Sequence, residues 1–462
     1  MRPYYGGMTE PGTTDPQASR RTFLKTSLTA AAAMATPWPT CAQDTPDQDD
    51  ATQGAPEPRF TADVPVTQLT QGPEFHWFGY YDKANYSPDN SLVLTNQVDF
   101  EHRSPTADDT IRVGYVPTDG SGAFTELGTS NAWGWQQGCM LQWVPSQGRT
   151  VIWNDREGEG EDARFVSHIR NLDDPSQDRT LPMPVYCVSP DGTFAVTTDF
   201  ARIQNMRPGY GYPGVEDPYA DQKAPDESGI HYVDLKTGET RLIITYNEIA
   251  SSKHKGFSLM KKWHYFNHLL ISPDGERFAF LHRWRKKPSR IDGQAVENAG
   301  SFSTRMITAD CHSGLGRFVI DGSGKTSHFI WRESEMIVAW TEHQGQMGFY
   351  GIAEGTRDVR PIPKRLMPAN GHNTFVPGTR NDWVLCDTYP DKQTRMQTVY
   401  LVHLPSERRI DLGQFYSPPE YTGEWRCDTH PRCSRDGRLV TIDSPHNGGR
   451  QVYQLDISGV LF

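Results

Sequence analysis

The stretch Ser272-Pro273-Asp274-Gly275 separates two short apolar runs, Leu269-Leu270-Ile271 before it and Phe278-Ala279-Phe280 after it. Proline fixes the backbone angle at the second turn position, and aspartate and glycine adopt the remaining turn geometry at little cost. Apolar runs of this length, bounded by turn residues, are typical of buried strands. The stretch therefore predicts two antiparallel strands joined by a tight turn.

This turn recurs along the chain, so the prediction extends to the whole fold. Clear or degenerate copies stand at Ser87–Asn90, Val144–Gly148, Ser189–Gly192, Ser272–Gly275, Arg332–Glu335, Val376–Thr379 and Ser434–Gly437. Seven units spaced by roughly 45 to 85 residues, each reading as a meander of about four strands, match the radial repetition of a β-propeller. The sequence thus predicts an all-β fold, a seven-bladed β-propeller that forms one domain over residues 63–462.

The N-terminal segment differs from the rest. Arg20-Arg21 precedes a short alanine-rich run, 26–36, and Thr40-Cys41-Ala42 offers a small-residue cleavage site. Twin arginines before a short apolar region are typical of a Tat signal peptide, here residues 1–42. Residues 43–62, rich in Asp, Gln, Thr and Pro, predict a disordered linker. We expect the Tat machinery to export the chain to the periplasm or the medium.

The charge and hydropathy of the chain limit the classes of partner that it is expected to bind. The formal net charge is −11 and no basic stripe is visible, which argues against nucleic acid as a partner. No segment after the signal is long and apolar enough to span a membrane.

Histidines recur at one position relative to the turns. In a propeller of this type, the strand before each turn is the innermost, and counting back six residues from the turn aspartate gives His268 and His430. The degenerate turns place His328 and His372 in about the same register, and the first turn gives Lys83. We therefore expect four imidazoles from successive blades to converge at one end of the channel. Histidines that only pack at strand ends are the alternative.

A metal site is expected within this ring. Asp428 and His430 point to the same side of an extended strand, so they can share one ion. His328 is a further candidate ligand, and Glu424 or a water completes the set. Mixed imidazole and carboxylate ligation suits several divalent cations. The alternative for Asp428 is a buried acid neutralised by a neighbouring arginine.

Aromatic and amide side chains surround the predicted ring. They suit a sugar ring that bears a carboxylate, although aromatics in all-β folds are more often core. The candidate substrate-binding residues are His372, Trp135, Gln137, His264, Tyr265 and Tyr81.

The order of the motifs resembles that of oligogalacturonate lyases, which are seven-bladed propellers. The matching motifs, spread over most of residues 75–460, are Tyr81-Asp82-Lys83, Asn267-His268-Leu269, Ser327-His328-Phe329, Gly371-His372 and Asp428-Thr429-His430-Pro431. The resemblance implies a metal, Mn²⁺ in that family, held by His328, Asp428 and His430. It also implies a base at His268 and a substrate-binding arginine at Arg202.

Two departures from the family concern the metal. The family has His-Pro-His-Pro where this chain has Asp428-Thr429-His430-Pro431, so a carboxylate replaces one imidazole. The family's ligand glutamine has no clear match, and Glu424 is the nearest candidate. Zn²⁺ and Ca²⁺ therefore stay open beside Mn²⁺.

These features predict β-elimination on an acidic oligo- or polysaccharide. A neutral imidazole at His268 takes the proton next to the carboxylate, while the metal and Arg202 stabilise the developing charge. Lys83, His372 or Tyr265 would bind the substrate or protonate the leaving oxygen.

Two other functions fit the same pattern. A glycoside hydrolase needs two carboxylates, which Asp387, Asp428 and Asp443 could supply. A TolB-like binding propeller would show the same turns without catalysis.

Overall fold

The computed structural model describes residues 59–291, 294–296, 299–356 and 358–461. The chain divides into two units, Met1–Gly54 and Ala55–Phe462, and every described residue belongs to the second. The predicted Tat signal and residues 43–58 of the predicted linker lie outside the described residues. Within the described part, we find no helix with the length and apolar character needed to traverse a bilayer.

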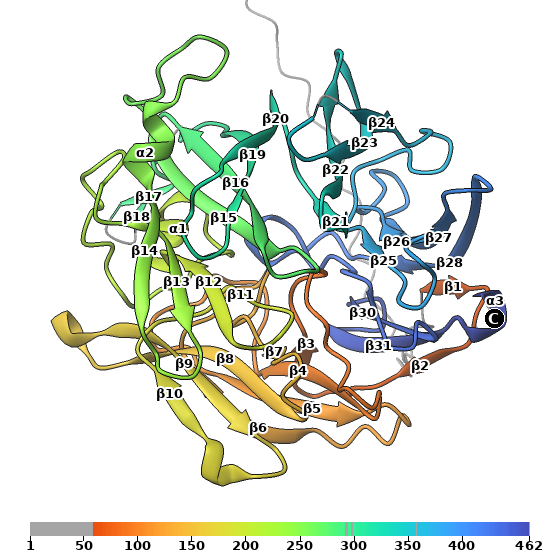
Figure 1. Cartoon of the computed structure of the whole chain (residues 1–462). Helices are drawn as coiled ribbons and strands as arrows, with labels where there is room; N and C mark the ends of the chain where they lie inside the picture. The colour runs from red at the N-terminus through yellow and green to blue at the C-terminus, as the bar shows by residue number, and fades with distance from the viewer. Residues whose placement is uncertain (1–58, 292–293, 297–298, 357, 462) are drawn as a thin grey trace, which may run out of the picture. The chain divides into compact units, whose positions relative to one another are not determined.

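Seven antiparallel sheets, called blades one to seven here, make up the second unit (Figure 1). In chain order, the first three are β3 (Phe75–Trp77), β4 (Leu92–Val98), β5 (Ile111–Pro117), β6 (Thr125–Ser130); β7 (Gln142–Trp143), β8 (Thr150–Glu157), β9 (Arg164–Asn171), β10 (Arg179–Leu181); and β11 (Cys187–Val188), β12 (Phe194–Thr198), β13 (Gly229–Asp234), β14 (Thr240–Thr245). Blades four and five are β15 (Trp263–Ile271), β16 (Arg277–Arg285), β19 (Ser303–Asp310), β20 (Phe318–Gly324); and β21 (Phe329–Glu333), β22 (Met336–His343), β23 (Gln346–Ala353), β24 (Val359–Pro361). Blades six and seven are β25 (Thr374–Phe375), β26 (Trp383–Asp387), β27 (Met396–His403), β28 (Arg408–Tyr416), β1 (Phe60–Ala62); and β29 (Arg432–Cys433), β30 (Leu439–Ser444), β31 (Gln451–Asp456), β2 (Val66–Gln68). The predicted seven-bladed β-propeller is confirmed.

The two N-terminal strands close the ring. β1 pairs with β28 and β2 pairs with β31, so the start of the described chain completes blades six and seven. Phe60–Ala62 had been assigned to the end of the linker, but the residues form β1 because β28 offers them a free sheet edge. Blade one meets blade seven through a hydrogen bond of 2.9 Å from Asn85 Nδ2 to Thr441 Oγ1.

The recurring turns have the chemistry that their sequence predicts. The serine hydroxyl of each clear copy donates to the aspartate two residues on, at 2.5–2.6 Å, in Ser87–Asp89, Ser189–Asp191, Ser272–Asp274 and Ser434–Asp436. Gly192 has a φ of +72°, and a Cβ there would lie 2.1 Å from the carbonyl oxygen of Pro145 in the neighbouring blade. Glycine at this turn therefore also lets two blades approach closely.

The remaining elements are short. A two-stranded hairpin, β17 (Arg290–Ile291) and β18 (Gln294–Ala295), lies between β16 and β19. The helices are α1 (Phe200–Met206), α2 (Tyr246–Ser251), α3 (Ser458–Leu461) and the 3-10 turns η1 (Gly160–Asp162), η2 (Pro175–Gln177) and η3 (Gly423–Trp425). The segment between α1 and β13 contributes Arg207 and Tyr210 to the site described next.

Candidate functional site

Four histidines from successive blades meet near the inner strands. His268 lies within β15, while His328, His372 and His430 stand just before the inner strands of blades five, six and seven. The ring centroids of His328 and His430 each lie 4.2 Å from that of His372. The Tyr80 ring lies 4.9 Å from both His268 and His430. The register inferred from the turns thus brings the four side chains together in space.

The backbone at two of these histidines is left-handed. The φ angles are 52° at His268 and 40° at His430, and Met140, the equivalent position of blade two, has a φ of 55°. Non-glycine residues rarely adopt this conformation, and it is kept only where the surroundings enforce it. In blade four it coincides with a register shift of β15 against β16 between Asn267 and Leu270. This interruption of the strand is a tertiary feature that strand alternation alone does not predict.

Three side chains present ligand atoms to one another. The ligand atoms of His372, Asp428 and His430 lie within 4.8 Å of one another, and all three residues are buried. Within the described part of the chain, Nε2 of both imidazoles and Oδ1 of Asp428 have no hydrogen-bond partner. Buried polar atoms are normally paired, and these converging unpaired atoms are of the types that can hold a divalent cation. We call these three residues the channel cluster.

A second layer of contacts orients the channel cluster. Asp387 lies 3.0 Å from Nδ1 of His372, which assigns the proton to Nδ1 and leaves Nε2 free to bind a cation. Asp387 also accepts hydrogen bonds from Thr429 Oγ1, at 2.6 Å, and from the backbone N–H of His430, at 3.2 Å. One buried carboxylate thus fixes both imidazole-bearing segments, as outer-layer acids do in metal sites.

The protonation states suit a cation. Burial lowers the pKa of His372 to about 3 and holds the pKa of His430 well below its usual value, so both imidazoles are neutral at neutral pH. Asp428 Oδ2 accepts a hydrogen bond of 2.7 Å from Arg426 Nε. Two neutral imidazoles and one carboxylate fit Mn²⁺ or Zn²⁺, and the arginine alternative for Asp428 accounts for only one of its oxygens.

Two predicted ligands lie outside this cluster. His328 sits beside His372, but its Nδ1 lies 3.0 Å from Asn370 Oδ1 and its Nε2 lies 3.4 Å from the Tyr389 hydroxyl. It does not belong to the group of ligand atoms within 4.8 Å of one another. Glu424 is not in that group either: its Oε2 accepts a hydrogen bond from Ser104 Oγ and pairs with Arg290, while its buried Oε1 has no hydrogen-bond partner among the described residues.

His268 has the environment of a neutral base. Its ring stacks on Tyr80, whose hydroxyl lies 3.5 Å from His268 Nε2. Burial, followed by the positive charges of Arg283 and Arg207, holds the pKa of His268 well below its usual value. The imidazole therefore stays unprotonated and able to accept a proton at neutral pH.

Arg202 and His264 occupy structural positions, which corrects two predictions. The Arg202 guanidinium pairs with Asp217 at 3.1 Å and donates to the backbone carbonyl oxygens of His264, Tyr219, Gln222 and Lys223. No donor is left for a substrate, because the segment between α1 and β13 and the His264 carbonyl of β15 use every N–H group of the guanidinium. His264 is equally saturated: Nδ1 lies 2.8 Å from Nε2 of His282, and Nε2 lies 3.0 Å from the carbonyl oxygen of Leu259.

Trp135 is a core residue rather than a sugar platform. It is 1% exposed, packs against Trp77 and Trp133, and donates its indole N–H to the backbone carbonyl of Arg103. Tyr81 contacts His372 with its ring, but its hydroxyl is bound to the backbone N–H and C=O of Phe329. These aromatic side chains serve packing because the blades need apolar volume between them.

The other predicted residues lie around His268. Gln137 accepts a hydrogen bond from the Tyr186 hydroxyl, which in turn accepts one from the backbone N–H of His268. Lys83 is buried, pairs with Asp82 at 3.0 Å, and lies over the Tyr186 ring. The Tyr265 hydroxyl is buried without a partner among the described residues. Their roles toward a substrate stay predictions.

The sequence analysis missed several groups that complete this environment. The Tyr210 hydroxyl accepts hydrogen bonds from Arg426, at 2.9 Å, and Arg207, at 3.2 Å. Burial alone would raise the pKa of Tyr210, but the two guanidiniums more than offset it, so the pKa lies below its usual value. Tyr80 precedes the predicted residue Tyr81 in the sequence but is not itself among the predicted residues. The sequence signal for Tyr210 is the stretch 207–213, which is rich in glycine and tyrosine and lies between α1 and β13.

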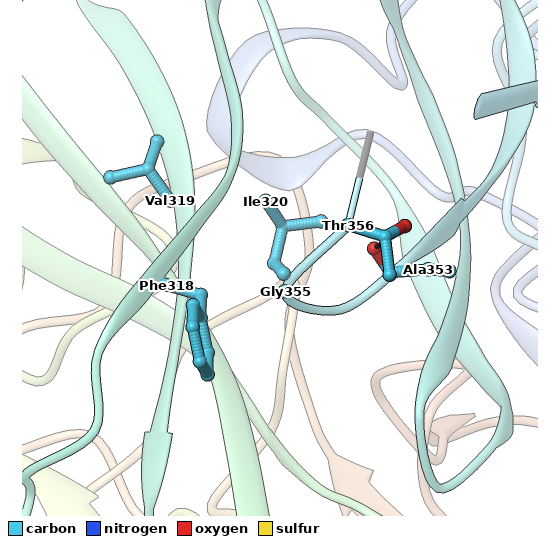
Figure 2. A pocket seen from close by; sticks show the side chains of 6 residues that line it. All are labelled: Phe318, Val319, Ile320, Ala353, Gly355 and Thr356. Carbon is cyan, nitrogen blue, oxygen red and sulfur yellow. Dashed lines mark hydrogen bonds between the residues drawn. The ribbon is translucent and has the colours of Figure 1, made fainter. Parts of the chain in front are cut away.

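A surface cavity of about 360 Å³ lies far from this chemistry. Its lining consists of Phe318, Val319, Ile320, Ala353, Gly355 and Thr356, which bear no titratable group. Figure 2 shows Ile320 facing the turn at Gly355 and Thr356, while Val319 points away. The cavity lies between an outer strand of blade four and a turn of blade five, and it contains none of the side chains that could perform catalysis.

Comparisons with known proteins agree with this fold. No family model and no curated protein matches the chain. Among solved structures, the chain is similar to an oligogalacturonate lyase from Vibrio parahaemolyticus, with 13% identity, a TM-score of 0.55, and coverage of 86% of this chain and 96% of that one. An oligogalacturonate lyase in complex with manganese gives 13% identity, a TM-score of 0.57, and coverage of 86% and 94%. At this identity the likeness shows the fold alone, and the predicted resemblance is confirmed at that level.

Proposed function

We propose that this protein is a metal-dependent lyase that cleaves a uronic-acid-containing saccharide by β-elimination. The observation that carries the proposal is the channel cluster, His372, Asp428 and His430, whose unpaired ligand atoms converge beside the neutral imidazole of His268. The likeness to oligogalacturonate lyases adds a propeller of the same architecture. Calcium fits this site less well than Mn²⁺ or Zn²⁺, because two of the three ligands are nitrogens.

The reaction needs a proton removed from carbon next to a carboxylate. In β-elimination a base takes the C5 proton, the bond from C4 to the glycosidic oxygen breaks, a C4=C5 double bond forms, and the leaving oxygen gains a proton. A divalent cation in the channel cluster would supply positive charge that stabilises the substrate carboxylate as negative charge develops on it. The chain's own residues must then supply the base and the acid.

His268 and Tyr80 have the properties that these two roles need. His268 is neutral and lies beside the cluster, so it can accept the C5 proton. Burial holds the pKa of Tyr80 well above its usual value, so its hydroxyl stays protonated at neutral pH. Tyr80 lies between His268 and His430, where it can donate a hydrogen bond to the leaving oxygen.

The acids of the site do not favour a glycoside hydrolase. That reaction needs two carboxylates that flank the bond. Asp387 is engaged with His372 and Thr429, and Asp443 accepts hydrogen bonds from the backbone of Phe78 and Gly79 and pairs with Arg432. Of these three aspartates, Asp428 is the one with a buried carboxylate oxygen that has no hydrogen-bond partner in the described chain. A purely binding propeller has no need for unpaired imidazoles that converge on one point.

The decisive assay follows near-UV absorbance of the unsaturated product. The protein is treated with a chelator and then supplied with Mn²⁺, Zn²⁺ or Ca²⁺, with polygalacturonate, oligogalacturonates and alginate as substrates. We expect absorbance to rise only after metal is restored. New reducing ends without this absorbance would establish hydrolysis, and no reaction on any uronate would contradict the proposal.

We also propose that the chain is exported through the Tat pathway, on the strength of Arg20-Arg21 and the following apolar run. Replacing both arginines by lysine keeps the charge but should leave the protein in the cytoplasm. Unchanged export of the double variant would contradict this route.

A further inference from the structure

Arg283, on β16, differs from the other deeply buried arginines of the propeller. Its side chain is 2% exposed, and its Nε and Nη1 atoms have no hydrogen-bond partner among the described residues. The other arginines that are at most 2% exposed all bind protein partners: Arg202, Arg432 and Arg450 pair with acids, and Arg305 donates to His282 and to backbone carbonyls. Within the described ranges, no carboxylate lies within ion-pair distance of Arg283. An unpaired buried charge is costly and is retained where a ligand neutralises it.

A second cation stands beside Arg283. The Arg207 guanidinium lies 4.9 Å from the centre of the Phe302 ring, and the Arg283 guanidinium lies 4.7 Å from the same centre. Burial, and then repulsion by Arg207, lowers the pKa of Arg283. The Tyr265 ring centre lies 6.4 Å from that of Phe302, and its buried hydroxyl is also without a hydrogen-bond partner in the described part of the chain. Two like charges and an unpaired hydroxyl thus surround one aromatic ring.

We infer that Arg207, Arg283 and Tyr265 form an anion subsite that is separate from the channel cluster. Its ligand is an oxyanion on a saccharide, a carboxylate or a sulfate ester, whose oxygens accept the unpaired N–H and O–H groups. Phe302 is 36% exposed, so its ring can cover the face of the attached sugar. That the ligand is a saccharide rests on the proposed function. That the ligand is an anion rests on the unpaired donors alone.

The subsite lies next to the proposed base and is linked to the cluster by one tyrosine. The Arg207 guanidinium lies 4.2 Å from the centre of the Tyr210 ring, and that centre lies 5.7 Å from the centre of the His268 ring. Arg207 contacts the Tyr210 hydroxyl, and Tyr210 is bound on its other side by Arg426, the partner of Asp428. A substrate that spans both sites therefore carries at least two anionic groups. One would lie at the metal and the other at the arginine pair, which predicts an acidic oligosaccharide rather than a monosaccharide.

The test measures binding without metal, so it is independent of lyase activity. Chelated wild-type protein and the Arg283→Met variant are titrated at constant ionic strength with galacturonate, galactose 6-sulfate and neutral galactose, by thermal shift and calorimetry. We expect at least one anionic sugar to stabilise and bind the wild type. Binding by Arg283→Met should be at least about tenfold weaker, because a charged hydrogen-bonding partner is lost. Whichever anionic sugar binds more tightly identifies the oxyanion.

A matched variant separates a ligand-binding arginine from a structural one. Arg450 is equally buried but paired, so Arg450→Met should lower the Tm and still respond to the anionic sugar. The ligand-free Tm of Arg283→Met should equal or exceed that of the wild type, since the change removes an unpaired charge. Equal binding by wild type and Arg283→Met, no binding of either anion by the wild type, or a Tm loss as large as that of Arg450→Met would overturn the inference. If Arg450→Met does not fold, Glu101→Gln replaces it as the milder control.

Discussion

Two groups of buried histidines in this propeller have similar burial and opposite hydrogen bonding. In blade four, His264 contacts His282, and His282 Nδ1 accepts a hydrogen bond of 2.9 Å from Arg305, so each ring nitrogen of the two histidines is used. In the channel cluster, Nε2 of His372 and Nε2 of His430 are unpaired within the described chain. A buried histidine therefore indicates a metal site where one of its ring nitrogens is left without a partner. Arg202 and Arg283 repeat this contrast among the arginines.

The largest effect is expected from His430→Ala. The change removes one of three ligand atoms, so bound metal should be lost and the lyase rate should fall more than about a thousandfold. Metal analysis and the near-UV assay check this. His264→Gln, its counterpart in the saturated group, should keep metal and activity in the folded protein. Equal loss of activity in both variants would remove the distinction between the two groups.

Arg202→Met tests whether an arginine with all its donors engaged serves stability rather than substrate binding. The change leaves Asp217 buried and unpaired, so the free energy of unfolding should fall by about 3–5 kcal/mol. Urea unfolding followed by tryptophan fluorescence measures it. Asp217→Asn serves if the first variant does not fold. A wild-type midpoint together with lost saccharide binding would return Arg202 to the substrate site.

Asp387→Asn tests the residue that orients the imidazole of His372 in the channel cluster. The amide cannot hold the Nδ1–H of His372 as a carboxylate does, so metal affinity should fall about 10- to 100-fold. Competition with a coloured chelator measures the affinity. Activity at saturating metal should recover most of its wild-type value, whereas a directly catalytic Asp387 would leave the saturated rate low.

The smallest expected effect is on the pH dependence of the free energy of unfolding. Burial lowers the pKa of His264 to about 4, so between about pH 6.5 and 4 the unfolded state binds a proton that the folded state does not. Its contribution to stability is therefore complete above the unfolded pKa and is lost as the pH falls toward 4. In this window each such histidine adds a slope of about 1.4 kcal/mol per pH unit. His264→Gln should flatten the slope of unfolding free energy by about that amount, and an unchanged slope would contradict the assignment.

The sequence by itself determined the propeller. Four serine–aspartate turns and three degenerate copies, all read from local sequence, predicted the number of blades and the common register of His268, His328, His372 and His430. The spacing of the turns along the chain predicts positions in the fold, because each blade is a meander whose strands follow in chain order.

Which side chains lack partners depends on the folded arrangement of the blades. Arg202 and Arg283, or His264 and His430, are equivalent as residue types, yet distant backbone carbonyls and acids saturate the first of each pair and not the second. Those partners come from other loops and blades, and the left-handed backbone at His268 and His430 is likewise imposed by packing. Hydrogen-bond saturation depends on contacts between segments far apart in the chain, and local sequence does not encode them.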